Sequence, residues 1–292
     1  TLAGRGIIPG AHLFADIYLR DKAMRIVRIY SFLALLFAAP ATIAKDLVLT
    51  APPRESEQKA LEIFQPIADY LTRALGRPVV YKFSDNWLTY QSEMQKDLYD
   101  IVFDGPHFIS YRMTRHQHTP LVKLPGKFVF IIIAKKGNDR INKIEDVNGR
   151  RLCAPAPPNL GALTALAQYT NPARQPILVD TKGFPQTYEG LLSGKCVAAA
   201  MQIKVFEKLD KEKKAAKILF ESKGLPNQAI SASPRLDVAQ RAKLAEALLS
   251  AAGKQATAKL REEYNGQDFV PAAAQEYEGH HILLKDTWGF HI

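Results

Sequence analysis

The chain has 292 residues, of which 47% are hydrophobic and 23% are charged, and these fractions exclude a disordered or fibrous protein. The length is enough for two lobes of roughly 100–150 residues each. The formal net charge of +10 raises nucleic-acid binding as a hypothesis. However, the basic residues are scattered, and the one dense run, near Lys211, also contains acids. We therefore expect no nucleic-acid partner and interpret this run as a solvated helix face.

The first informative segment lies near the N-terminus. Two arginines precede an apolar run from Ile29 to Ala39, and small residues follow it at Thr42 and Ala44. This order indicates a secretory signal peptide over residues 24–44, and its apolar run is shorter than the roughly 20 residues that span a bilayer. We therefore expect an exported, periplasmic protein, and we interpret residues 1–23 as an upstream extension or artefact.

Strand and helix patterns alternate after the predicted signal peptide. The segment DLVLTAPP is a predicted strand, and apolar residues at helical spacing from Leu61 to Leu75 follow it, with Pro66 expected to restart the helix and Gly76 to end it. The next segments are PVVYKFS (strand), NWLTYQSEMQK (helix), YDIVFDG (strand) and PHFISYRMTRH (helix). This succession predicts a βαβαβ lobe with a parallel sheet.

The alternation then continues with different residues and predicts a second α/β lobe. Its strands are KFVFIIIAKKG, RLCAPAP, PILVDT and CVAAAMQ, and its helices are KIEDVNGR, LGALTALAQYT and TYEGLLSG. Two further helices are predicted at residues 237–252 and 257–264. The long strands FVFIIIAK and NQAISAS are where the chain could cross between lobes. We therefore place lobe 1 at residues 45–127 plus 228–292, and lobe 2 at residues 128–227.

The order of these segments carries a family resemblance. APPRES, PIADYLTRALGRPV, NW and DIVFDGPHF are followed by FVFIIIAKKG, IEDVNGRRLCAPAPPNLG and YEGLLSGKCVAAAM. This order resembles the phosphate/phosphite/phosphonate-type substrate-binding proteins of ABC importers. The resemblance implies a type II periplasmic binding fold, with two parallel-sheet α/β lobes joined by two crossing strands and a small ligand held between them. A membrane permease is the implied partner, and we expect a monomer without a cofactor.

The stretch LCAPAPPNLGALTAL, residues 152–166, is the first candidate ligand site. Its prolines stiffen the approach to a helix, whose first turn leaves the amides of Asn159, Leu160, Gly161 and Ala162 free to bind an anion. The resemblance implies small hydroxyl residues before this glycine. Because proline, asparagine and leucine stand there instead, we expect backbone amides to hold the ligand. An ordinary strand-to-helix connection capped by Asn159 is the alternative.

Further candidates follow the strands of lobe 1. Arg54 comes after the first strand, at the end where open parallel sheets place ligands. The resemblance matches Trp87 to an aromatic residue that closes on the ligand, and matches the turn Asp104, Gly105 and His107 to the end of the third strand. A carboxylate at Asp104 favours an amine-bearing or zwitterionic ligand. Capping of the next helix by Asp104 is the alternative.

The motifs of common enzyme classes do not occur in this chain. It has no G-x-S-x-G, H-E-x-x-H, P-loop or dinucleotide fingerprint, and His116 and His118 fit no zinc pattern. We therefore expect a binding protein for a small anionic or zwitterionic ligand, with no catalysis and no metal, and Tyr188 completes the predicted ligand set. A periplasmic sensor that docks on a membrane receptor is the alternative, because both roles need the same lobe closure.

Cys153 and Cys196 are the only cysteines, and both are predicted to open strands. The flavodoxin-like order 2-1-3 places these strands side by side, about 4.8 Å apart, which suits disulfide Cα distances of about 4.4–6.8 Å. An oxidising compartment permits the bond. We predict a structural disulfide at the strand ends opposite Asn159, and two buried free thiols are the alternative.

Overall fold

The structure is a computed structural model that describes residue 1 and residues 45–264, 266–290 and 292. The predicted signal peptide and the preceding extension lie outside these residues. Residues 46–292 pack together as one compact unit. Among the described helices, none combines the length and apolar character that a bilayer-spanning segment needs.

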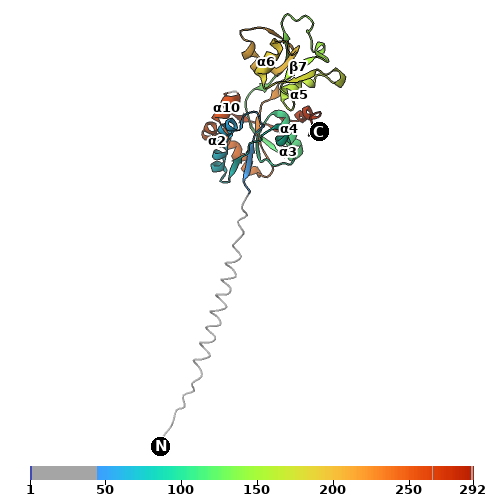
Figure 1. Cartoon of the computed structure of the whole chain (residues 1–292). Helices are drawn as coiled ribbons and strands as arrows, with labels where there is room; N and C mark the ends of the chain where they lie inside the picture. Colours follow the sequence, from blue (N-terminus) through green and yellow to red (C-terminus); the bar gives the residue numbers. More distant parts are fainter. Residues whose placement is uncertain (2–44, 265, 291) are drawn as a thin grey trace. The chain divides into compact units, whose positions relative to one another are not determined.

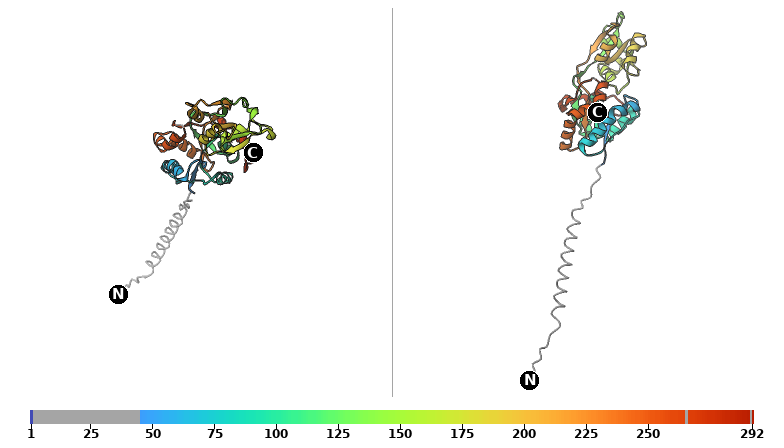
Figure 2. Two further views of the ribbon diagram at one scale, coloured as in Figure 1. Left: turned by 45° about the horizontal axis from the view of Figure 1, so that its top comes forward. Right: turned by 90° about the vertical axis from the view of Figure 1, so that its left-hand side faces the viewer.

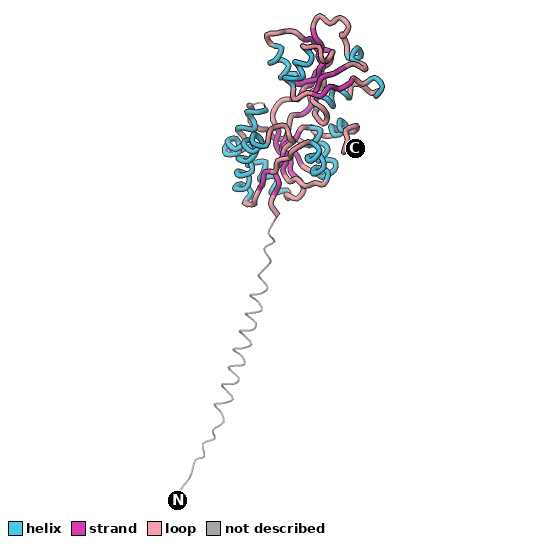
Figure 3. The backbone as a smooth tube through the Cα atoms, in the orientation of Figure 1, coloured by secondary structure: helices cyan, strands magenta, loops and turns pink. Residues whose placement is uncertain are grey.

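Lobe 1 is built around a six-stranded sheet with the order β13-β4-β12-β3-β1-β2 (Figure 3). β1 is parallel to β2 and β3, whereas β12 is antiparallel to β3 and β4, and β13 is antiparallel to β4. The sheet is therefore mixed rather than purely parallel. Its strands are β1 (Leu47–Thr50), β2 (Val79–Tyr81), β3 (Ile101–Asp104), β4 (Thr119–Lys123), β12 (Ala229–Ala232) and β13 (Val270–Pro271).

Helices cover both faces of this sheet, with α2 and α10 on one side and α3 and α4 on the other (Figure 1). In the views of Figure 2 the blue N-terminal and the red C-terminal segments lie together in this lobe. The helices are α2 (Glu57–Leu75), α3 (Trp87–Gln95), α4 (Pro106–His116), α8 (Val238–Leu249), α9 (Ala251–Ala256), α10 (Ala258–Tyr264), η3 (Ala274–Glu276) and η4 (His280–Leu284).

The longest of these helices, α2, shows how local sequence sets an element. Ser56 caps it by accepting a hydrogen bond from the Lys59 amide, and Gly76 ends it in the left-handed conformation at φ 68°. The expected restart at Pro66 is wrong, because α2 runs unbroken through it. Pro66 removes one amide donor, but it and Glu62, whose carbonyl loses that donor, are exposed, so water can replace the bond.

Lobe 2 is built around a five-stranded sheet with the order β10-β6-β9-β7-β8. β7 is parallel to β8 and β9, and β6 is antiparallel to β9 and β10, so this sheet is also mixed. The strands are β6 (Phe130–Lys135), β7 (Arg151–Ala154), β8 (Ile177–Asp180), β9 (Ala198–Gln202) and β10 (Ala216–Glu221). The helices are η1 (Ile144–Val147), α5 (Leu160–Leu166), η2 (Pro172–Arg174), α6 (Phe184–Leu192) and α7 (Ile203–Asp210).

A two-stranded ribbon joins the lobes. β5 (Lys127–Phe128) leads from the first sheet to the second, and β11 (Leu225–Pro226) leads back, and the two pair antiparallel. The long strand predicted for KFVFIIIAKKG is thus two strands, interrupted at Val129. β5 overlaps the start of the predicted crossing FVFIIIAK, whereas β11 lies just before the predicted crossing NQAISAS. The exact lobe boundaries stay a prediction.

Two predictions in the C-terminal third of the chain are wrong. The basic run after Asp210 is a turn between α7 and β10, not a helix face, and neither of these elements was expected. Lys214 adopts φ 45°, and the Asp210 carboxylate accepts a hydrogen bond from the Ala215 amide, so the helix cannot continue. The helix predicted over 237–252 is divided into α8 and α9 by Ser250, whose side chain caps α9.

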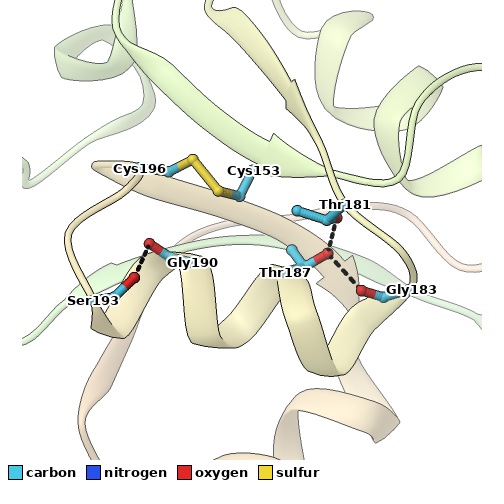
Figure 4. The surroundings of a disulfide bond; sticks show 7 residues. All are labelled: Cys153, Thr181, Gly183, Thr187, Gly190, Ser193 and Cys196. Atoms are coloured by element: carbon cyan, nitrogen blue, oxygen red, sulfur yellow. Dashed lines mark hydrogen bonds between the residues drawn. A yellow bond between two sulfur atoms is a disulfide. The ribbon is translucent and has the colours of Figure 1, made fainter.

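The predicted disulfide between Cys153 and Cys196 is present in the structure, with a Cα–Cα distance of 5.7 Å (Figure 4). The order β8-β7-β9 confirms the 2-1-3 arrangement. However, neither cysteine opens its strand: Cys153 lies opposite Ala199 in the register, and Cys196 precedes β9. The bond lies against α6, where a Cβ added at Gly190 would come 2.7 Å from the sulfur of Cys153. Only glycine therefore allows this close packing.

The disulfide is expected to stabilise lobe 2 by constraining its unfolded chain. The cysteines are 43 residues apart, and the loop-entropy model gives about 4 kcal/mol for a loop of this size. In urea titrations, the free energy of unfolding of the double variant Cys153→Ser, Cys196→Ser should therefore lie below that of the wild type by most of this amount. Intact-mass measurement after alkylation without reductant should show no adduct on the unfolded mature protein, and two adducts would contradict the bond.

Candidate functional site

A cavity of about 420 Å³ lies between the lobes. Aromatic side chains form much of its wall, namely Trp87, Phe128, Phe130, Phe184 and Tyr264. Its polar lining is mostly cationic or amide, from Arg54, Lys127, Asn159, Gln202, Lys204, Lys208, Asn227 and Gln228, with one carboxylate, Glu263. A volume of this size suits an organic ligand, since small-molecule sites usually occupy about 300–1,000 Å³.

Most of the ligand candidates predicted from the sequence meet at this cavity. They come from four elements: the loop after β1, the start of α3, the start of α4 and the start of α5. β1 and β3 are adjacent parallel strands, so the loops at their carboxyl ends converge on one edge of the sheet. The candidates that line the cavity are Arg54, Trp87, Gly105, His107, Asn159 and Leu160.

The structure does not bring the other candidates to the cavity wall. Gly161 donates its amide to the side chain of Asn159, which caps α5 as the alternative interpretation holds. Ala162 packs in a core cluster of lobe 2. Tyr188 lies in another core cluster of that lobe, and its hydroxyl donates a 2.5 Å hydrogen bond to Asp210. Contacts within lobe 2 thus account for the positions of these three residues. A direct ligand role for them stays a prediction.

Asp104 lies at the end of β3 and is fully buried. Its carboxylate accepts hydrogen bonds from the Tyr90 hydroxyl at 2.6 Å and from Arg112 Nε at 2.8 Å. It does not cap α4, whose N-cap residue is Gly105 and which has no side-chain cap. Since Arg112 compensates its charge, Asp104 presents no free carboxylate to a ligand, and the argument for an amine-bearing ligand loses its support.

The Asp104–Arg112 pair is expected to be essential for stability. The substitution Arg112→Met leaves a buried carboxylate without a cation, and breaking a buried pair in this way costs about 3–5 kcal/mol. Adding Asp104→Asn removes the uncompensated charge and should recover part of the loss. Urea denaturation of both variants tests this, and a single variant as stable as the double one would contradict it.

Arg54 supplies the positive charge of the lobe 1 wall. Its Nη1 is buried and has no hydrogen-bond partner, and its guanidinium lies 5.9 Å from the centre of the Tyr264 ring. Burial acts to lower the pKa of Arg54, but Tyr264 and the Asp104 carboxylate outweigh it, so the pKa is raised. The Nη1 atom of Arg54 is therefore a charged donor without a partner.

The charges around Arg54 also favour an anion in the cavity. Glu263 is held by Lys59 at 2.7 Å, so its negative charge is already compensated. Within the described part of the chain, no ion pair joins Lys127, Lys204 or Lys208 to a carboxylate. The cavity is thus set up electrostatically for an anion.

His107 links the two lobes. Its Nε2 lies 3.1 Å from the Pro158 carbonyl, and because a carbonyl only accepts, Nε2 carries the proton. Burial lowers the pKa of His107 to about 3, so the ring stays neutral near pH 7. Its Nδ1 is buried and has no partner. The Nδ1 atom of His107 is therefore an acceptor without a partner.

The free energy of unfolding is expected to fall as the pH drops below about 6.5. Burial lowers the pKa of His118 to about 4 and that of His107 to about 3, so the unfolded chain binds protons there that the folded chain does not. Each histidine should cost about 1 kcal/mol between pH 6.5 and 5.5, because the unfolded imidazole is already half protonated at pH 6.5.

Urea titrations at these two pH values measure this loss. The variant His118→Asn should reduce the pH dependence, because it removes one of the two most strongly affected imidazoles, whereas His116 and His280, whose pKa values burial also lowers, remain. A wild-type free energy of unfolding that stays level over this interval would contradict the assignment.

Several lining residues were not foreseen in the sequence. Lys204 and Lys208 lie on α7, a helix that the alternation did not reveal. Tyr264 ends α10, which is distant in sequence from the other lobe 1 candidates. Asn227 and Gln228 could have been found, because they follow β11, and segments that cross between lobes border the space between them.

Two α/β lobes, a connecting ribbon and a cationic cavity between the lobes define a solute-binding protein. A family model described as "ABC transporter, phosphonate, periplasmic substrate-binding protein" matches residues 49–277. The chain belongs to this family. Its members are periplasmic proteins that bind small molecules and work with ABC-transporter permeases, and they are transport proteins rather than a class of enzyme.

Solved structures support the fold. PhnD1 of Prochlorococcus marinus in complex with methylphosphonate is 15% identical with a TM-score of 0.59, covering 84% of this chain and 99% of that one. A Xanthomonas citri protein bound to ATP is 12% identical with a TM-score of 0.67, covering 82% and 96%. The binding component of a Pseudomonas aeruginosa ABC phosphonate transporter is 15% identical with a TM-score of 0.58, covering 80% and 83%. The predicted type II periplasmic binding fold is confirmed.

Among the described residues, no group of three or more histidine, cysteine, aspartate or glutamate side chains could hold a metal ion.

Proposed function

We propose that this protein captures an organic phosphorus oxyanion, of the phosphonate class, in the periplasm and delivers it to the permease of an ABC importer. The observation that carries the proposal is Arg54, whose buried Nη1 has no partner and which lines a cavity between two lobes. A buried charged donor without an acceptor is costly unless a ligand supplies one. The same proposal includes export through the predicted signal peptide at residues 24–44 and action as a monomer.

We assign the anionic group to the start of α4, rather than to the α5 amides expected from the sequence, and two features support this assignment. α4 is an 11-residue helix, and its N-terminal end favours negative charge. Gly105 precedes it, and a Cβ there would come 3.1 Å from His107 Cε1 and 3.8 Å from Arg54 Nη2. A side chain at position 105 would crowd His107, and glycine avoids this contact beside Arg54.

Lobe 2 closes the cavity from the opposite side. Asn159 and Leu160 stand at the start of α5, and the Pro158 carbonyl beside them receives the His107 hydrogen bond. The aromatic wall and the lysines of α7 suit an organic group attached to the oxyanion. Two similar structures, solved with methylphosphonate and with ATP, support this class, since both ligands carry phosphorus oxygens on an organic part.

The test is a thermal-shift screen followed by calorimetry. Methylphosphonate and larger phosphonates are expected to raise the melting temperature, because a ligand at a hundred times its Kd adds about 2.7 kcal/mol. The variant Arg54→Gln should weaken binding roughly 10- to 100-fold, since it loses a charged hydrogen bond.

The matched control is Arg73→Gln, an exposed arginine on α2 of the same lobe that does not line the cavity. Stabilisation by amino acids but by no phosphorus oxyanion would contradict the proposal, and so would equal affinities of the two variants.

A further inference from the structure

We infer that the cavity selects an oxyanion that carries a proton, because it sets the acceptor His107 Nδ1 beside the donor Arg54. The inference rests on the proposed function. It adds the protonation state of the bound ligand and names His107 as the residue that recognises the proton. A P–OH group would donate to Nδ1 while its neighbouring P–O⁻ accepts from Arg54. An oxyanion without a proton would satisfy Arg54 alone and leave Nδ1 without a partner.

The orientation of the His107 ring is set by its surroundings. Nε2 donates to the Pro158 carbonyl at 3.1 Å, and the ring stacks on Phe108 with 4.0 Å between centroids. Turning the ring over would place a carbon against that carbonyl and lose the hydrogen bond. Nδ1 is therefore the ring nitrogen that keeps a free lone pair, and it is buried without a partner.

Nδ1 and the guanidinium converge on one place. A Cβ added at Gly105 would lie 3.2 Å from Nδ1 and 3.8 Å from Arg54 Nη2, so both groups are close to the same point. All three residues line the cavity. Adjacent oxygens of one tetrahedral oxyanion can meet a donor and an acceptor that are this close, provided that one of those oxygens is protonated.

The charges facing His107 keep its ring an acceptor. Burial lowers its pKa to about 3, and Arg54 and His280 on η4 further disfavour a protonated ring. The two nearby carboxylates are already engaged, Asp104 with Arg112 and Glu263 with Lys59. Between pH 5 and 8 the ring thus remains neutral, and any pH dependence of binding in this range reports the ionisation of the ligand.

Two isosteric probes separate the proton from shape and charge. Methylphosphonate as a monoanion and methanesulfonate have nearly the same size and the same charge, but only the phosphonate carries a hydroxyl. Arg54 and the cavity lysines attract both probes. A difference in affinity between the two probes therefore measures the contribution of the acceptor His107 Nδ1.

Calorimetry with both probes on wild type, His107→Leu and His107→Gln tests the inference. Wild type should bind methylphosphonate roughly 10- to 100-fold more tightly than methanesulfonate, the range expected for leaving a buried polar group unpaired. His107→Leu removes the acceptor and should bring the two affinities within a few-fold. His107→Gln keeps an acceptor and a donor and should retain a preference. Circular dichroism checks that each variant is folded.

The outcomes distinguish the two proposals. Equal binding of both probes by wild type would overturn the inference and leave the proposed function standing, whereas binding of neither probe would overturn both. If His107→Leu does not fold, the wild-type pH profile decides. Affinity for methylphosphonate should fall as its dianion forms while affinity for methanesulfonate stays level, and affinity that rises with the dianion would overturn the inference.

Discussion

The buried ion pair between Asp104 and Arg112 is the interaction on which the candidate site depends. It ties the end of β3 to α4, and Tyr90 adds α3 to the same network. The start of α4, with Gly105 and His107, is thereby held at the cavity wall. Because the pair compensates its own charges, the arginine that remains unpaired at this edge of the sheet is Arg54, and the anionic preference of lobe 1 follows from it.

The same region joins ligand recognition to contact between the lobes. One nitrogen of His107 donates to Pro158 in lobe 2, and the other faces the space beside Arg54. The chain connections between the lobes are confined to the ribbon of β5 and β11. A ligand in the cavity would therefore contact both lobes near the place where one side chain already bridges them. This coupling of occupancy to closure is what a binding protein of an ABC importer requires.

Much of the fold could be predicted because its signals are local. Apolar spacing, the Ser56 cap and Gly76 define α2, and the short apolar runs define the parallel strands. The 2-1-3 order then placed Cys153 near Cys196. α7 and β10 were missed because a lysine-rich turn lies between them and masks their patterns. The strands β6 and β12 were predicted, but their antiparallel direction was missed because apolar spacing does not reveal strand direction.

By itself, the sequence determined the α/β alternation, the ends of the parallel strands and thus the positions of Arg54, Gly105 and His107. These features depend on residues within a few positions of one another and on the rule that parallel strands end at one edge. Only the tertiary structure decided that Asp104 is neutralised by Arg112, that Tyr188 faces the core, and that the α7 lysines line the cavity. Burial and charge pairing join residues from separate elements, and local periodicity carries no information about which of them meet.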